Sequence, residues 1–216
     1  MGGGLPARNS GILWGDYATA EKLFTDLLPD AEKFHPKDRY LAELLSMLGT
    51  SYNLDHKHEQ AESVLKRALQ VYAMISPPDL LGAERTEDNL GAIYLEREDY
   101  ASAERHFFEA LSLSEKIPAG PVSDRGNILL NLGFIRMVQG RYPEAEQLLD
   151  QSVEALASDP GPWAQRDFAS ASYRLGGVYT YENRYPEAEQ QYRKALESQE
   201  KLSGPNSRES LARSAV

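Results

Sequence analysis

The heptad RYPEAEQ occurs at residues 141–147 and again, without a single change, at residues 184–190. The two copies begin 43 residues apart. A catalytic motif has little use for a second copy in a small domain, whereas a structural module that stacks on copies of itself needs one every time. The repeated heptad therefore predicts an array of similar structural units.

The Ala-Glu pair inside this heptad marks five copies of the unit. The pairs begin at Ala20, Ala61, Ala103, Ala145 and Ala188, so their spacings are 41, 42, 42 and 43 residues. A Leu-Gly pair precedes each of the last four, with its glycine twelve residues before the alanine, and a large apolar or aromatic residue follows every alanine by four positions. Small and large residues at helical spacing predict two amphipathic helices per copy, which approach each other closely at the glycine and the alanine.

Turn signals place the ends of these helices. The polar stretches LDHK, REDY, QGRY and ENRY separate the first helix of a copy from the second, and prolines follow each second helix. Pro29 falls inside one predicted helix, which we expect to kink or to end early. We predict first helices at about 38–54, 80–96, 122–138 and 163–181, and second helices at about 17–34, 58–74, 100–116, 142–157 and 185–202.

Two stretches, LGAIYLEREDYASAERHFFEAL (90–111) and LGGVYTYENRYPEAEQQYRKAL (175–196), resemble tetratricopeptide repeats. The period of about 42 residues is longer than the common one of about 34 and is similar to that of the kinesin-light-chain-like subclass. The resemblance implies an all-α fold, a right-handed superhelical solenoid of antiparallel helix pairs. It covers residues 15–205, as the second helix of repeat one and four full repeats, after a tag or incomplete first helix at 1–14 and before the start of a truncated or capping helix at 206–216.

Composition limits the function classes. The formal net charge is −10, which disfavours nucleic acid and anionic membranes as partners, because both attract basic surfaces. The chain has no cysteine and no apolar run long enough to span a membrane, which suits a cytoplasmic location. The resemblance implies a non-catalytic scaffold that binds a protein partner, as an extended peptide or a helix, in its concave groove. The alternative is a structural or regulatory segment that packs on domains of its own protein or self-associates through its open ends.

The resemblance also implies that first helices line the concave face of the solenoid. In this family an asparagine two residues before the glycine often pairs with peptide backbone, which gives that role to Asn89 and Asn131. Arg85 and Arg174 are suited to binding a carboxylate of the ligand. An alternative stays open, in which the asparagines only bond the next helix and Phe134 and Met137 belong to the core. The candidate groove residues are Asn53, Arg85, Asn89, Asn127, Asn131, Phe134, Met137, Tyr173, Arg174 and Tyr181.

Histidines occur in two further places that could carry chemistry. The stretch DHKHE at 55–59 brings two histidines together, but a metal site needs further oriented ligands and the stretch lies in a predicted turn, so we expect no metal and no cofactor. No catalytic grouping can be assembled around His106. Copy four carries Arg136 where the other copies have a packing tyrosine, which indicates either a softer repeat or an arginine that serves a partner.

Overall fold

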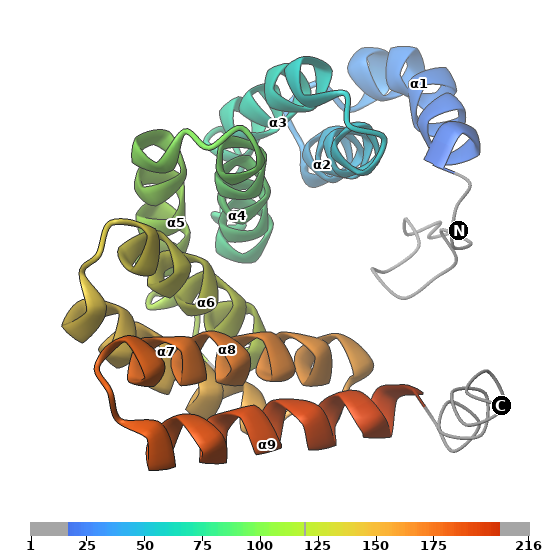
Figure 1. The fold of residues 1–216 in the computed structure, drawn as a ribbon. Helices are drawn as coiled ribbons and strands as arrows, with labels where there is room; N and C mark the ends of the chain where they lie inside the picture. The colour runs from blue at the N-terminus through green and yellow to red at the C-terminus, as the bar shows by residue number, and fades with distance from the viewer. Residues whose placement is uncertain (1–16, 119, 204–216) are drawn as a thin grey trace, which may run out of the picture. The chain divides into compact units, whose positions relative to one another are not determined.

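In the computed structural model of the chain, residues 17–118 and 120–203 are described, and every regular element among them is an α-helix. The segments predicted at 1–14 and 206–216 lie outside these residues. The chain divides into two compact units, Met1–Pro118 and Ala119–Val216, and each is described by itself. The predicted all-α fold of antiparallel helix pairs is confirmed within both units (Figure 1).

The helix boundaries agree with those expected from the turn signals to within two residues. Helix α1 continues through Pro29, so the early end predicted for it is absent. The first unit contains α1 (Tyr17–Phe34), α2 (Arg39–Leu54), α3 (His58–Tyr72), α4 (Leu80–Glu96) and α5 (Tyr100–Ser114). The second contains α6 (Val122–Val138), α7 (Tyr142–Ala157), α8 (Pro162–Tyr181) and α9 (Tyr185–Ser203).

Each helix pair closes on one glycine of its first helix. A Cβ atom added to Gly91 would lie 2.6 Å from the ring of Phe107, and one added to Gly133 would lie 2.7 Å from Leu149 Cγ. The same contact joins Gly49 to Leu65 and Gly176 to Tyr192, always sixteen residues further along the chain. No side chain fits between the two helices at these points, so the glycine of the repeat is required by the close approach.

The turn between the helices of each pair has one recurrent backbone conformation. His56, Glu98, Gly140 and Asn183 all have positive φ, between 56° and 72°, and each comes seven residues after the glycine of its repeat. The amide of the following residue bonds the carbonyl five positions earlier, as Lys57 does to Tyr52 and Arg184 to Tyr179. This is the left-handed C-cap that ends a helix and satisfies its last carbonyls, and it turns the chain back for the second helix.

Successive pairs are joined by the glutamate of the Ala-Glu signature. Glu62 on α3 accepts a hydrogen bond from the Tyr94 hydroxyl at 2.7 Å and pairs with Arg97 at 2.7 Å, both in the next repeat. The same position forms the ion pairs Glu21–Lys57 at 2.7 Å and Glu146–Arg184 at 2.8 Å. The signature residue therefore links one repeat to the next, in addition to the apolar packing.

Arg136 has a structural place in repeat four. Its side chain is only 7% exposed, its Nη1 donates to Gln139 Oε1 at 3.1 Å and its Nε lies 3.3 Å from Glu144 Oε2. A buried guanidinium with acceptors of its own repeat takes the space that a tyrosine fills elsewhere. Because the side chain of Arg136 is buried, it offers almost no surface to a partner, which was the second of the two interpretations.

A comparison of two glycines tests the close approach. We expect Gly133→Ala to lower the free energy of unfolding by about 1–2 kcal/mol, because overpacking against Leu149 outweighs the gain in helix propensity. Gly177→Ala is the control, since a Cβ there meets its nearest atom, Met137 Cε, at 3.5 Å. We expect it to be neutral or to stabilise by up to about 1 kcal/mol. Urea denaturation measures both, and equal effects of the two changes would contradict the packing described.

A pH series tests the inter-repeat role of Glu62. Its hydrogen bonds to Lys66, Tyr94 and Arg97 lower the pKa of Glu62 from 4.5 to about 2. A carboxyl whose pKa falls on folding stabilises the protein above its unfolded pKa, and this contribution disappears as the pH drops from 4.5 towards 2. We expect Glu62→Gln to lower the free energy of unfolding by on the order of 1 kcal/mol at pH 6 and by progressively less below pH 4.5. Glu59→Gln, at an exposed position of the same helix, is the control, and a pH-independent cost of Glu62→Gln would contradict the assignment.

Candidate binding surface

The candidate groove residues all lie on the first helices of their pairs. Asn53 is on α2, Arg85 and Asn89 are on α4, four further residues are on α6 and three are on α8. Because α4 and α6 belong to different units, the surface is built within each unit. In the first unit α2 packs on α4, and in the second α6 packs on α8, so these pairs of first helices define the two surfaces.

In the first unit, polar side chains of α2 and α4 bond to each other. Asn89 Nδ2 donates to Thr50 Oγ1 at 3.1 Å, and the hydroxyls of Ser46 and Thr86 are 2.8 Å apart. Asn53 Oδ1 is 3.1 Å from Nδ1 of His58, and Arg85 is half-buried with contacts of its own. Asn89 therefore uses one amide proton to join two neighbouring first helices, as the alternative interpretation of the asparagines expects.

In the second unit the asparagines form a chain of hydrogen bonds. Asn131 Nδ2 donates to Asn127 Oδ1 at 3.2 Å, and Asn127 Nδ2 donates to Asp167 Oδ2 on α8 at 3.1 Å. All three side chains are half-buried. These bonds fix the orientation of the amides and leave acceptor capacity on Asn131, since an amide oxygen has two lone pairs.

Arg174 on α8 lies over the ring of Phe134 on α6. Its Cζ is 4.0 Å from the ring centroid, which is a close cation–π contact. Within residues 17–118 and 120–203, no acidic side chain pairs with this guanidinium. Burial lowers the pKa of Arg174, because the charged form has lost part of its water.

The contact between Arg174 and Phe134 occupies the same register as that between Asn89 and Thr50. In both, a residue two before the glycine meets the residue one after the glycine of the preceding first helix. The first unit fills this place with a neutral hydrogen bond, and the second fills it with a cation over an aromatic ring. The repeat geometry is shared, but the chemistry differs.

Two exposed tyrosines of α8 are supported by rings of the second helices. Tyr181 is 66% exposed and stacks on Tyr142 of α7 with a centroid distance of 4.9 Å. Tyr173 is also 66% exposed, and its ring centroid is 5.4 Å from that of Tyr192 on α9. Met137 is half-buried and packs on the core of the second unit. The second unit thus presents two exposed aromatic rings of α8, the helix that also carries Arg174, each held by a second ring.

The sequence did not indicate three of the partner residues as part of the site, namely Asp167, Tyr142 and Tyr192. Tyr192 lies four residues after Ala188, a position that predicts packing between the two helices of a pair. Tyr142 and Asp167 lie outside the glycine-based positions, so no periodicity points to them. Contacts between helices of different repeats depend on how the pairs stack, which the period alone does not specify.

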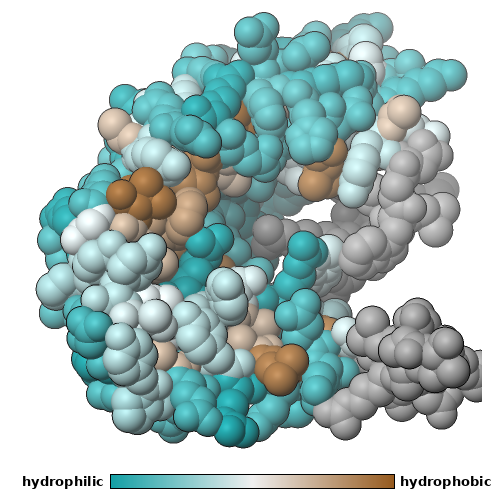
Figure 2. All heavy atoms as spheres, in the orientation of Figure 1, coloured by the Kyte–Doolittle hydropathy of each residue, from teal (hydrophilic) through white to brown (hydrophobic). Residues whose placement is uncertain are grey.

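The face drawn in Figure 2 is mostly hydrophilic. Figure 2 shows one face on which hydrophobic side chains form small separate patches, in agreement with a charged fraction of 26%. Among the described residues, no helix combines the length and the apolar character needed to cross a membrane.

Comparisons with known proteins place the fold. Three family models, each described as tetratricopeptide repeat, match residues 40–116, 89–161 and 168–209. No curated protein matches by sequence. Similar solved structures include BtubC (BKLC) from P. vanneervenii, at 20% identity and a TM-score of 0.74, where the match covers 88% of this chain and 76% of that one.

Two other solved structures are similar along most of their length. MamA has 20% identity and a TM-score of 0.61, with 88% of this chain and 92% of MamA covered. The nearly identical TPR-like repeats of a putative kinesin light chain from Podosopora anserina have 15% identity and a TM-score of 0.63, with 86% and 88% covered. At these identities the likeness concerns the fold.

A double-mutant cycle tests the bond between Asn89 and Thr50. We expect Asn89→Ala and Thr50→Ala each to lower the free energy of unfolding by about 0.5–1.5 kcal/mol, because each removes a hydrogen bond between half-buried side chains. The double variant should cost less than the sum of the two, with a coupling energy of at least about 0.5 kcal/mol. Chemical denaturation measures the cycle, and additive effects would show that the two side chains do not interact.

Proposed function

This chain belongs to the tetratricopeptide repeat family, and from that premise we propose that it is a non-catalytic scaffold that binds a carboxylate-bearing extended peptide along α6 and α8. The observation that carries the proposal is the guanidinium of Arg174. It is half-buried over Phe134 and has no acidic partner among the described residues. The partner would be a protein, and the place of binding would be the cytoplasm.

The state of Arg174 favours a carboxylate ligand. A guanidinium that has lost water without gaining an anion retains a desolvation cost, which the lowered pKa of Arg174 reflects. A carboxylate of the peptide, from an acidic side chain or the C-terminus, would accept two parallel hydrogen bonds from it. The Phe134 ring restrains the guanidinium plane, so little side-chain entropy is lost when the peptide binds.

The surrounding side chains suit the rest of such a peptide. Tyr173 and Tyr181 offer exposed rings that are already supported by Tyr192 and Tyr142. Rigid aromatic residues and arginine are the types that dominate binding energy at protein interfaces. Asn131 is held by its bond to Asn127 and keeps an oxygen able to accept from peptide backbone.

The alternative function, packing on another domain or on a second copy, is favoured by the outer face of α9. Tyr185 and Leu196 are 61% and 60% exposed there, and with Ala188 and Tyr192 they line a shallow pocket. Light scattering of the samples used for peptide binding separates the two functions. A mass that rises with concentration favours the second, and a constant monomer mass together with peptide binding favours the first.

A peptide array tests the proposed site. The probes are acidic peptides with free C-termini and the same peptides with amidated C-termini and Gln or Asn in place of the acids. We expect binding of the acidic set, and for the strongest binder an affinity at least about tenfold lower with Arg174→Gln, measured by fluorescence anisotropy, because the charge-assisted bonds are lost. The Arg174→Lys variant should have an affinity between those of the unmodified chain and Arg174→Gln, since a lysine keeps the charge but cannot form two parallel hydrogen bonds.

The control is Arg193→Gln on α9. Arg193 is an exposed arginine paired with Glu189 on the same helix, α9. Its loss should leave the affinity within about twofold, so that a general effect of net charge is separated from a local one. Equal binding of the neutral peptides, or full affinity of Arg174→Gln, would contradict the proposed site.

A further inference from the structure

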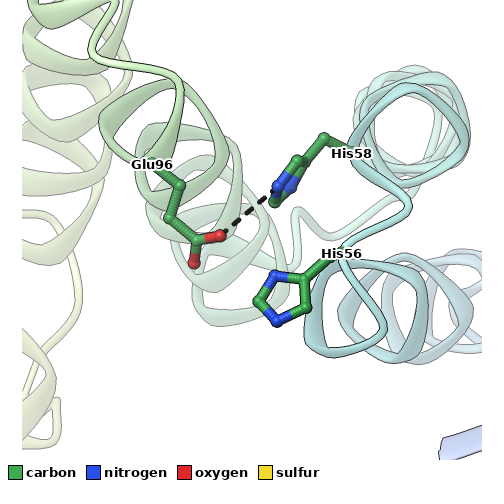
Figure 3. A group of neighbouring side chains, drawn as sticks. All are labelled: His56, His58 and Glu96. Atoms are coloured by element: carbon green, nitrogen blue, oxygen red, sulfur yellow. Dashed lines mark ion pairs between the residues drawn. The ribbon is translucent and has the colours of Figure 1, made fainter.

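We propose that His56, His58 and Glu96 form a binding site for a divalent transition-metal ion, best suited to Zn²⁺, that ties repeat two to repeat three. One candidate ligand atom from each residue lies within 4.8 Å of the others. His56 is in the turn before α3, His58 is the first residue of α3 and Glu96 is the last residue of α4. Figure 3 shows both imidazole rings and the carboxylate directed towards one another.

The distance between His58 and Glu96 fits two ligands of one ion. His58 Nε2 is 3.6 Å from Glu96 Oε2, which is longer than a good hydrogen bond. Two donor atoms bound tetrahedrally to zinc, each about 2.0–2.1 Å from the metal, are about 3.4 Å apart. The His56 donor lies within 4.8 Å of the other two, and its exposed ring is not packed in the core, so it is able to turn towards a bound ion.

The second ring nitrogen of His58 is already held. Its Nδ1 lies 3.1 Å from Asn53 Oδ1, an amide oxygen that can only accept. Nδ1 therefore carries the proton of the neutral ring, and the lone pair of Nε2 is directed towards Glu96. Metal-binding histidines commonly have such a partner on the other nitrogen, which fixes the ring orientation and the tautomer.

The neighbouring lysine does not compete with a cation. Lys57 stands between the two histidines in sequence, but its Nζ pairs with Glu21 at 2.7 Å and with Asp55 at 2.9 Å. Its charge is thus compensated by two carboxylates outside the cluster. Within the cluster, the negative charge of the Glu96 carboxylate attracts a divalent ion, and the two imidazole nitrogens add neutral donors.

The donor set selects the class of metal. Two imidazole nitrogens and one carboxylate oxygen suit zinc, copper and nickel, whereas Mg²⁺ and Ca²⁺ prefer all-oxygen sites. Three protein ligands leave a fourth position for water or for a donor from a partner. The ligands come from two helix pairs, so a bound ion would link the turn after α2 to the end of α4.

The sequence predicts no metal site, because it brings only the two histidines of DHKHE close together. The third donor, Glu96, is 38 residues after His58 and meets it only when repeat three stacks on repeat two. The turn that contains the first histidine is the left-handed C-cap after α2, in which His56 has a φ of 56°.

The test is a Zn²⁺ titration of the tag-free full chain by calorimetry, with Mg²⁺ as the comparison ion. We expect one Zn²⁺ per chain with micromolar affinity and no response to Mg²⁺. His56→Asn, His58→Gln and Glu96→Gln should each weaken binding at least about tenfold, while His35→Gln, a histidine paired with Asp38 away from the cluster, should leave it unchanged. Asparagine is chosen at position 56 because it tolerates positive φ.

Two further readouts identify the site itself. X-ray absorption of the zinc complex should show a shell of nitrogen and oxygen donors with two imidazoles. Saturating Zn²⁺ should raise the melting temperature of the unmodified chain and not that of Glu96→Gln, because only the folded repeats bring the three ligands together. Absence of saturable binding below about 100 µM, or zinc affinity unaltered in all three ligand variants, would overturn the proposal.

Discussion

The structure depends on the contact between the glycine of each first helix and the large side chain sixteen residues later. Gly91 against Phe107 and Gly133 against Leu149 leave no room for a Cβ, so the two helices of a pair are pressed together at one fixed point. This contact sets the register of the whole pair, because rotating either helix would bring a larger residue into the same space. The remaining faces of the pair then have to be covered by the next one.

That register explains why contacts between repeats recur at fixed positions. The signature glutamate reaches the next pair in three copies, as in Glu62 with Arg97 and Glu146 with Arg184, whereas that of the last copy, Glu189, pairs with Arg193 on its own helix. The residue two before the glycine contacts the preceding first helix, as a hydrogen bond at Asn89 and as a cation over a ring at Arg174. The same position imposed by stacking thus carries different chemistry in different repeats, and we propose that at Arg174 it binds a ligand.

The helices and their pairing could be predicted from the sequence, because the period of small and large residues encodes the contact within a pair. The glycine positions and the turn residues were found in this way. The role of Asn127 could not be found, since its partner Asp167 is forty residues away and belongs to a different pair. Glu96 was missed beside His58 for the same reason. Periodicity describes one pair at a time, whereas the candidate sites lie where pairs meet.

The central claim is that the guanidinium of Arg174, held over Phe134, is the point of recognition. Its Nε–H resonance in ¹⁵N-labelled protein reports on this most directly. The account predicts an upfield proton shift in the free chain, caused by the ring 4.0 Å from Cζ, and a downfield movement when an acidic peptide saturates the protein. A resonance that stays in place while the peptide is bound would show that recognition occurs elsewhere.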